Sequence, residues 1–284
     1  MDKKFSAKIF IDGGEPEETR QAKKLLGFLD GQTTNPTLIA KNLAASSGGA
    51  KLTQDEALGE YKRIAGEISK IIPHGSVSIQ VFANGKTESE EMLSQARERT
   101  KWIPNASIKF PCNAEGLKAA SVACREMPIN ITLVFTQSQA AAVYEATLGA
   151  KYPVFISPFV GRLDDRGENG MDVVSNMIKM YQSGDKHVEV LTASVRNIAH
   201  ILYALYLKSN IVTVPFKVFR QWADKNFMLP AENFVYNPGN LKAVPFRKDI
   251  MLGKPWQEYD LFHDLTDIGI EKFSADWNSL VQSS

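Results

Sequence analysis

A lysine near the middle of the chain has the surroundings of a reactive amine. Residues 107–111 (SIKFP) alternate polar and apolar side chains, which is the period of a β-strand. Pro111 ends the strand because proline has no N–H to donate. If Lys109 faces the protein interior, burial disfavours its ammonium form, and only a neutral amine attacks a carbonyl to form a Schiff base. On its own the pentapeptide fits better a lysine that reaches solvent, so the interpretation depends on the rest of the chain.

Further polar side chains lie where other predicted strands end. In barrel enzymes the carboxyl ends of the strands converge, and the catalytic residues lie there. An acid, an amine, amides, hydroxyls and two arginines at one barrel end suggest a carbonyl substrate with an anionic tail. In chain order the candidates are Asp12, Thr33, Asn35, Gln80, Lys109, Asn130, Thr132, Ser157, Phe159, Arg162, Ser194 and Arg196.

Several of these residues also fit an ordinary structural role. Asp12 precedes two glycines and fits a turn carboxylate, and Asn35 before Pro36 is a common turn pair. Arg162 is close in sequence to Asp164 and Asp165, with which it can form a surface ion pair worth about 0–1 kcal/mol. The case for a site therefore rests on the whole set of residues.

The elements that would position these residues recur in a regular order. Short apolar runs alternate with helical segments, which is the pattern of a parallel sheet with crossover helices. This order predicts a (β/α)8 TIM barrel; an open doubly wound sheet is the alternative, but its Gly-x-Gly-x-x-Gly phosphate loop is absent. The eight runs are residues 8–12, 27–30, 76–82, 107–111, 129–135, 152–160, 189–195 and 211–215.

The end of the chain departs from this alternation. Residues 217–284 contain four prolines before position 260, so we expect short helices joined by loops. Ile270, Phe273, Trp277 and Leu280 then fall on one helical face. We therefore expect one barrel domain over residues 1–284, with 217–284 as a helical extension packed on the barrel or on a neighbouring subunit of a homo-oligomer.

Composition limits the partners. With 284 residues, 44% hydrophobic and 23% charged, the chain suits a globular protein long enough for one barrel. A net charge of +1 gives no support for nucleic acid or an anionic membrane as partner. Two cysteines, no apolar leader and no membrane-spanning run indicate a cytoplasmic protein. The four histidines are far apart and match no metal-ligand spacing, so no metal is expected.

Five sequence blocks in order resemble the transaldolase family. They are Asp12 with residues 33–39 (TTNPTLI), 107–111 with 114–117 (AEGL), 130–135 (NITLVF), 157–162 (SPFVGR) and 193–196 (ASVR). The resemblance covers about residues 8–216 and the helix that contains Phe273 and Trp277. It implies an enzyme that moves a dihydroxyacetone unit from a ketose phosphate to an aldose phosphate.

The resemblance also implies a role for each catalytic residue. Lys109 forms the carbinolamine and Schiff base, and Asp12 takes the proton from the C4 hydroxyl as the C3–C4 bond breaks. Gln80 and Thr132 position a water that carries protons. The protonated imine is the electron sink, so no metal or organic cofactor is expected.

The remaining residues are expected to bind the sugar phosphate. Asn35 and Asn130 hold substrate hydroxyls, and Ser194 lies against the three-carbon unit. Arg162 and Arg196 grip the phosphate, for which a guanidinium fork is well shaped. The other candidate substrate-binding residues are Thr33, Ser157 and Phe159.

One pairing leaves the reaction open. The resemblance implies that transaldolases carry Glu on strand three and Phe on strand six, whereas their aldolase relatives carry Gln and Tyr. This chain has Gln80 with Phe159. The alternatives are an aldolase that releases free dihydroxyacetone, a transaldolase for a sulfonated ketose, and a silent sugar-phosphate-binding barrel.

Overall fold

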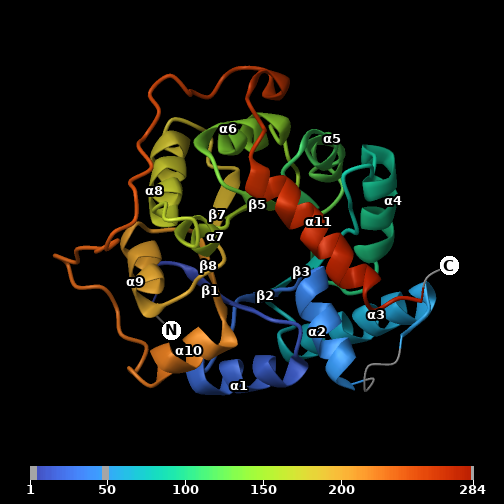
Figure 1. Cartoon of the computed structure of the whole chain (residues 1–284). Coiled ribbons are helices and arrows are strands. Elements are labelled where there is room, and N and C mark those ends of the chain that lie inside the picture. The colour runs from blue at the N-terminus through green and yellow to red at the C-terminus, as the bar shows by residue number, and fades with distance from the viewer. Residues whose placement is uncertain (1–4, 47–50, 283–284) are drawn as a thin grey trace.

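Eight parallel strands close into a barrel in which each strand pairs with the next one along the chain, and β8 pairs with β1. The computed structural model describes residues 5–46 and 51–282. Helices surround the strands on the outside (Figure 1), so the predicted (β/α)8 TIM barrel is confirmed. The strands are β1 Lys8–Asp12, β2 Gly31–Thr33, β3 Ser76–Gln80, β4 Ala106–Pro111, β5 Ile129–Val134, β6 Val154–Pro158, β7 Val188–Thr192 and β8 Ile211–Pro215.

One or two helices follow each strand along the chain. Helix α3 shows why they form where they do: Thr53 and Glu56 make a capping box at its start, and its apolar stripe from Ala57 to Ile68 is buried. The helices are α1 Pro16–Leu26, α2 Pro36–Ser46, α3 Gln54–Ile71, α4 Ser89–Arg99, α5 Ala114–Ala123, α6 Gln137–Ala146, α7 Val160–Asp164, α8 Gly170–Tyr181, α9 Ile198–Tyr206 and α10 Phe216–Ala223.

The second strand is not where the sequence pattern placed it. Residues 27–30 were expected to form it, but β2 begins at Gly31. Gly27 ends α1 with a φ of 86°, and residues 28–30 lead into the strand. A Cβ at position 31 would lie 2.5 Å from both the Phe10 ring and the Ser76 carbonyl oxygen. Only glycine allows the strand to pass so close, and a glycine weakens the sequence signal for a strand.

The register brings the predicted catalytic strands side by side. Lys109 on β4 pairs with Gln80 on β3 and with Asn130 on β5. On the other side of the barrel, Asp12 on β1 pairs with Thr33 on β2. Because all strands are parallel, these residues lie near the same, carboxyl end of the barrel.

The C-terminal segment crosses this end of the barrel. Residues 224–263 run along the outside of α9, α8 and α6 (Figure 1), with only the short 3₁₀ helix η1 (Trp256–Glu258) as regular structure. Helix α11 (Asp264–Asn278) then passes over the mouth from β5 toward α2 (Figure 1). Its stripe of Ile270, Phe273 and Trp277 is buried against its own barrel.

Candidate active site

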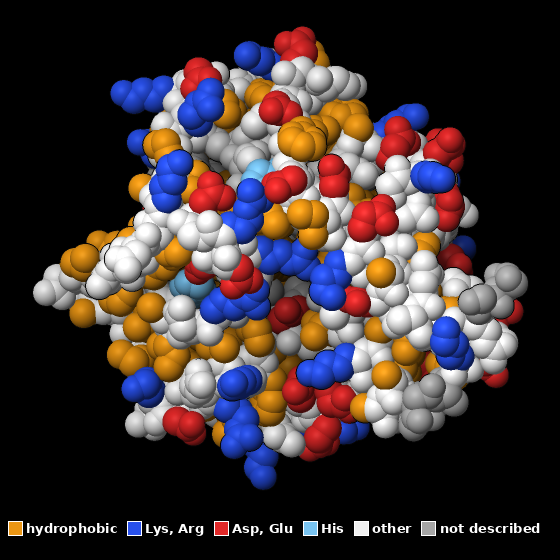
Figure 2. All heavy atoms as spheres, viewed as in Figure 1, with side chains coloured by type: hydrophobic (Ala, Val, Ile, Leu, Met, Phe, Trp, Pro, Cys, Tyr) orange, Lys and Arg blue, Asp and Glu red, His pale blue; other side chains and the backbone are white. Residues whose placement is uncertain are grey.

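A cavity of about 490 Å³ opens at the carboxyl end of the barrel, beside α11. In Figure 2, Lys and Arg side chains gather around this hollow. Residues from strands far apart in sequence form its wall, as the strand-end argument predicts. Of the candidate residues, the cavity is lined by Asp12, Thr33, Asn35, Lys109, Ser157, Phe159, Arg162, Ser194 and Arg196.

Lys109 is buried on β4, and its side chain reaches the cavity. The residue is 2% exposed, and its Nζ donates a hydrogen bond to the carbonyl oxygen of Thr34 at 3.0 Å. Burial lowers the pKa of Lys109 to about 8, the Asp12 carboxylate opposes this shift, and the Arg162 guanidinium adds to it. The neutral, nucleophilic form is therefore far more populated near neutral pH than for a lysine in solvent.

Asp12 ends β1 on another side of the cavity. The hydroxyl of Thr33 donates to its Oδ1 at 2.7 Å. Burial raises the pKa of the Asp12 carboxyl; the positive charge of Lys109, the Thr33 hydrogen bond and the charge of Arg196 lower it, in decreasing order. An acid held between these opposing influences suits a group that both takes and returns a proton.

Gln80, Asn130 and Thr132 do not line the cavity and lie inside the barrel wall. Asn130 accepts a hydrogen bond from Ser157 Oγ at 2.7 Å and donates to Ser78 Oγ at 3.2 Å. The side-chain oxygens Gln80 Oε1 and Thr132 Oγ1 are buried, and neither has a hydrogen-bond partner among the described residues. Buried polar atoms without a protein partner usually bind water.

A second layer of hydrogen bonds holds the backbone next to Lys109. The hydroxyl of Tyr61 accepts from the Gln80 N–H at 3.0 Å and lies 2.6 Å from Thr34 Oγ1. Thr34 Oγ1 donates to the Ser78 carbonyl at 2.7 Å, so Tyr61 is the donor to Thr34. Arg99 donates to the Gln80 carbonyl from behind. These bonds fix the carbonyl of Thr34 that Lys109 contacts.

Arg162 and Arg196 form the cationic end of the cavity. The guanidinium of Arg162 lies 5.4 Å from the ring centres of both Phe159 and Phe273. Burial lowers the pKa of Arg162, and the neighbouring Arg196 adds to this shift. Arg196 Nη2 lies 2.7 Å from Asp165 Oδ2 in a half-exposed ion pair. Asp165 thus pairs with Arg196, not with Arg162 as the sequence alternative suggested.

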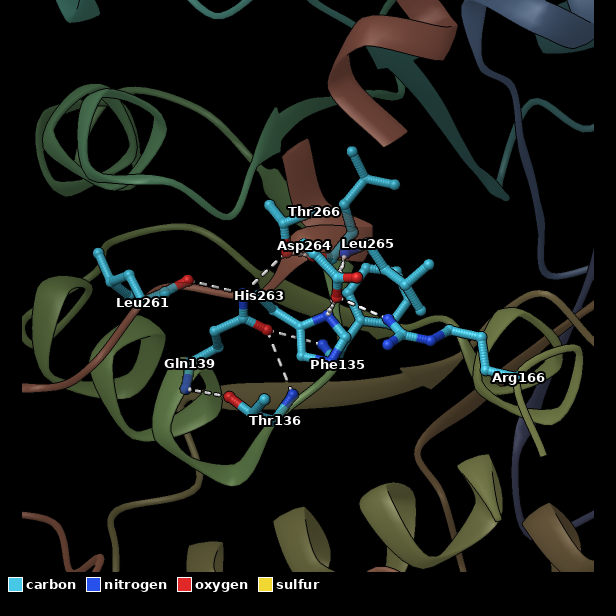
Figure 3. Close-up of polar contacts among 10 residues, drawn as sticks. Phe135, Thr136, Gln139, Arg166, Leu261, His263, Asp264, Leu265 and Thr266 are labelled. Atoms are coloured by element: carbon cyan, nitrogen blue, oxygen red, sulfur yellow. Dashed lines mark hydrogen bonds and ion pairs between the residues drawn. The ribbon is translucent and has the colours of Figure 1, made fainter. Parts of the chain in front are cut away.

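Helix α11 is fixed over the mouth by a group of polar contacts at its start (Figure 3). Gln139 Nε2 donates to Thr266 Oγ1 and to the Leu261 carbonyl, both at 2.9 Å. The ring of His263 stacks on Phe135 with centroids 4.9 Å apart. Arg166 pairs with Asp264 at 2.6 Å. Contacts with α6 and with the segments after β5 and α7 therefore hold α11 beside the cavity.

The cavity also includes residues that the sequence analysis missed. Thr213 on β8 follows the apolar Val212, and that alternation marks it as a candidate inward-facing polar residue. The residues from α11 carried no such signal, because nothing in the irregular segment before the helix predicts where it lies. The missed lining residues are Thr37, Leu38, Asp165, Arg166, Ala193, Val195, Thr213, Pro215, Leu265, Ile268, Lys272 and Phe273.

Two features of the described part of the chain bear on other classes of protein. None of its helices is long and apolar enough to cross a membrane. Within residues 5–46 and 51–282, no group of three or more His, Cys, Asp or Glu side chains is placed to hold a metal ion.

The architecture and the position of the cavity define a (β/α)8-barrel protein with its site at the carboxyl face, where barrel enzymes carry theirs. The chain belongs to the Transaldolase/Fructose-6-phosphate aldolase family, which it matches over residues 9–284. That match includes Asp12, Lys109, Arg162 and Arg196.

Curated relatives agree with this assignment. A probable transaldolase of Dehalococcoides mccartyi is 34% identical over 96% of this chain and 99% of its own length. A probable transaldolase of Geobacillus sp. is 35% identical over 95% of this chain and 98% of its own. A third, from Clostridium botulinum, is 36% identical over 95% and 96%, respectively. The likeness therefore extends over the barrel and the C-terminal segment alike.

Proposed function

We propose that this protein is a transaldolase that moves a dihydroxyacetone unit from a ketose phosphate to an aldose phosphate through a Schiff base on Lys109. The observation that carries the proposal is the buried Lys109 amine, with its pKa lowered to about 8, in one cavity with Asp12, Arg162 and Arg196. A sugar-binding barrel without catalysis has no need for a desolvated amine.

The reaction begins with the neutral Lys109 amine attacking the ketose C2 carbonyl. The hydroxyl of the carbinolamine takes up a proton and leaves as water, which leaves the nitrogen as a protonated imine. The C4 hydroxyl then gives its proton to Asp12, the O–H electrons form the new C4 carbonyl, and the C3–C4 bond breaks. The electrons of that bond move into the imine and leave an enamine on Lys109. The enamine carbon then attacks the carbonyl of the acceptor aldehyde, which reverses the cleavage step, and water hydrolyses the new imine to release the product ketose.

Other residues support these steps in distinct ways. Gln80 and Thr132 hold the water that moves protons during imine formation. Their two buried side-chain oxygens, which have no hydrogen-bond partner in the described part of the chain, support this role. Asn35 uses its Oδ1 to accept the Leu38 N–H at 3.0 Å, so its amide N–H groups remain to bind a substrate hydroxyl. Ser194, with a φ of 59°, is held in a left-handed conformation at the cavity wall, where the three-carbon unit binds.

The choice between transfer and release depends on the enamine. A group that delivers a proton and water to the enamine carbon favours free dihydroxyacetone. Phe159 lines the cavity and lies edge-on to Phe135 with centroids 6.2 Å apart. This apolar wall donates no proton and excludes water, so it favours transfer. Gln80 is the feature that favours the second candidate, an aldolase that releases dihydroxyacetone.

Borohydride reduction in the presence of a ketose phosphate tests the mechanism, because it converts the imine to a stable amine. We expect an adduct on Lys109, found by peptide mass spectrometry, and no adduct in Lys109→Arg, because arginine stays protonated. Lys118→Arg on the exposed face of α5 is the matched control and should trap the adduct normally. An adduct on another lysine, or none with any donor, would contradict the proposal.

A further inference from the structure

Three side chains on adjacent strands form a short chain of hydrogen bonds that ends on Asp12. Thr33 Oγ1 on β2 lies 2.7 Å from Asp12 Oδ1 on β1. The same oxygen lies 2.7 Å from Thr213 Oγ1 on β8, on the other side of β1. Thr33 and Thr213 are 2% and 1% exposed, so water does not compete freely for their hydroxyls.

The number of hydrogens decides the direction of this chain. A threonine hydroxyl has one hydrogen to donate. Thr33 gives its hydrogen to the Asp12 carboxylate, which has none to give in its ionised form. Thr213 must therefore donate to Thr33, and within residues 5–46 and 51–282 its hydroxyl has no other partner. The order is Thr213 to Thr33 to Asp12.

We propose that Thr33 and Thr213 are positioning residues for carbon–carbon bond cleavage, which hold Asp12 so that its Oδ2 takes the C4 hydroxyl proton. The inference rests on the proposed function. Oδ1 is occupied by Thr33, whereas Oδ2 accepts no hydrogen bond from any residue that the structure describes. Asp12 lines the cavity, so Oδ2 is the oxygen available to a substrate.

The proposal changes the role of Thr33. The sequence suggested that Thr33 binds substrate, but its hydrogen is committed to Asp12 and its oxygen accepts from Thr213. The step itself is balanced within the substrate and Asp12. The C4 O–H bond breaks and the proton joins Oδ2; the O–H pair becomes the carbonyl π bond as the C3–C4 pair enters the imine. Addition of the acceptor aldehyde returns the same proton.

The charged groups around Asp12 set the pH behaviour that this arrangement predicts. Lys109 on β4 and Arg196 after β7 favour its carboxylate, and the charge of Asp12 in turn raises the pKa of Glu18 on α1. Burial raises the pKa of Asp12, and the Thr33 hydrogen bond lowers it. Loss of the Thr33 hydroxyl therefore raises the pKa further, so that less carboxylate is present at a given pH. The acid limb of the pH profile for cleavage should move to higher pH.

Valine substitutions test the chain because valine has the shape of threonine without the hydroxyl. Thr33→Val should lower kcat/KM by about 10- to 100-fold, as expected for a hydrogen bond to a charged group, and Thr33→Ser should restore most of it. Thr213→Val should cost less, since Thr33 still donates to Asp12. In the Thr33→Val background, Thr213→Val should cost nothing more, because Thr213 acts only through Thr33.

Borohydride trapping separates the cleavage step from imine formation. If cleavage is slow, the adduct on Lys109 should carry the whole donor sugar, whereas rapid cleavage leaves the three-carbon unit. Thr33→Val should shift the trapped species toward the whole-donor adduct. Thr192→Val is the matched control, because that buried hydroxyl contacts Ser209 at 2.9 Å, away from the cavity; it should keep the ratio of the unmodified enzyme.

The outcomes distinguish this inference from the proposed function. Normal adduct formation in Thr33→Val with an unchanged adduct ratio and an unchanged acid limb would overturn the positioning role alone. Equal and additive losses from the two threonine substitutions would also overturn it. The absence of any adduct in the unmodified enzyme would overturn the proposed function and the positioning role with it.

Discussion

Removal of the guanidinium of Arg162 should weaken the binding of phosphorylated sugars more than removal of that of Arg196. A hydrogen bond to a charged group contributes about 1.5–3 kcal/mol, so Arg162→Ala should raise KM by about 10- to 150-fold. Arg162 lies over two aromatic rings, and within the described chain it forms no ion pair. Its hydrogen-bond donors are therefore available to the anion.

Arg196 starts from a different state. Its half-exposed ion pair with Asp165 is worth about 0–1 kcal/mol and has to give way to the substrate. The rise in KM for Arg196→Ala should therefore be smaller than the rise for Arg162→Ala, by a factor of up to about five. By the same argument, Asp165→Asn should tighten the binding of phosphorylated donors by up to about fivefold.

Steady-state kinetics with paired donors provides the measurement. Each variant is assayed with a ketose phosphate and with an unphosphorylated dihydroxyacetone donor, and Arg162→Lys tests whether charge alone suffices. We expect large losses on the phosphorylated donor and small ones on the other, with Arg162→Lys between the alanine variant and the unmodified enzyme. Equal losses on both donors would show that the arginines are structural. An Arg196→Ala loss larger than that of Arg162→Ala would refute the ranking.

Four further perturbations test the geometry of the site. The rate of imine formation should rise with pH through about 8 and level off at higher pH, because Lys109 attacks as the neutral amine. Single-turnover trapping at several pH values measures this rate, and an unbroken rise toward pH 10 would contradict the prediction. Phe159→Tyr should shift products from transfer toward free dihydroxyacetone. Gln80→Glu should speed imine formation and leave the product ratio unchanged. Product analysis with and without an acceptor measures both effects. Gly269→Ala should destabilise the protein by about 1–3 kcal/mol in urea unfolding, because the added Cβ would lie 2.5 Å from Leu133 and 2.8 Å from Arg162; an unchanged midpoint would mean that α11 moves freely.

The sequence predicted the barrel because strand and helix periodicity alternate clearly through most of the chain. The strand that carries Lys109 was expected at residues 107–111 and is found at Ala106–Pro111. The convergence of strand ends then brought nine of the candidate residues into one cavity. The prediction for β2 was wrong because a three-residue strand that opens with glycine has too little pattern to locate it.

Side-chain directions and long-range contacts could not be predicted from the sequence. Nothing in the motif around Thr33 shows that its hydroxyl donates to Asp12; that needs the register of β1, β2 and β8. The pattern of Ile270, Phe273 and Trp277 predicted a helix with a buried face but not what covers it. Its position depends on hydrogen bonds of Thr266 with Gln139 and Leu133, which are more than 100 residues away in the chain.

The placement of α11 divides the work of the site between two parts of the chain. The barrel strands supply Lys109 and Asp12, to which the proposed reaction assigns the carbonyl and the C4 hydroxyl. The cationic end of the cavity needs both parts, since Arg162 lies between Phe159 after β6 and Phe273 on α11. Both rings restrict where the guanidinium can point, and its partial burial between them reduces the screening of its charge by water. A change in α11 should therefore alter the recognition of the substrate's anionic tail before it alters imine chemistry on Lys109.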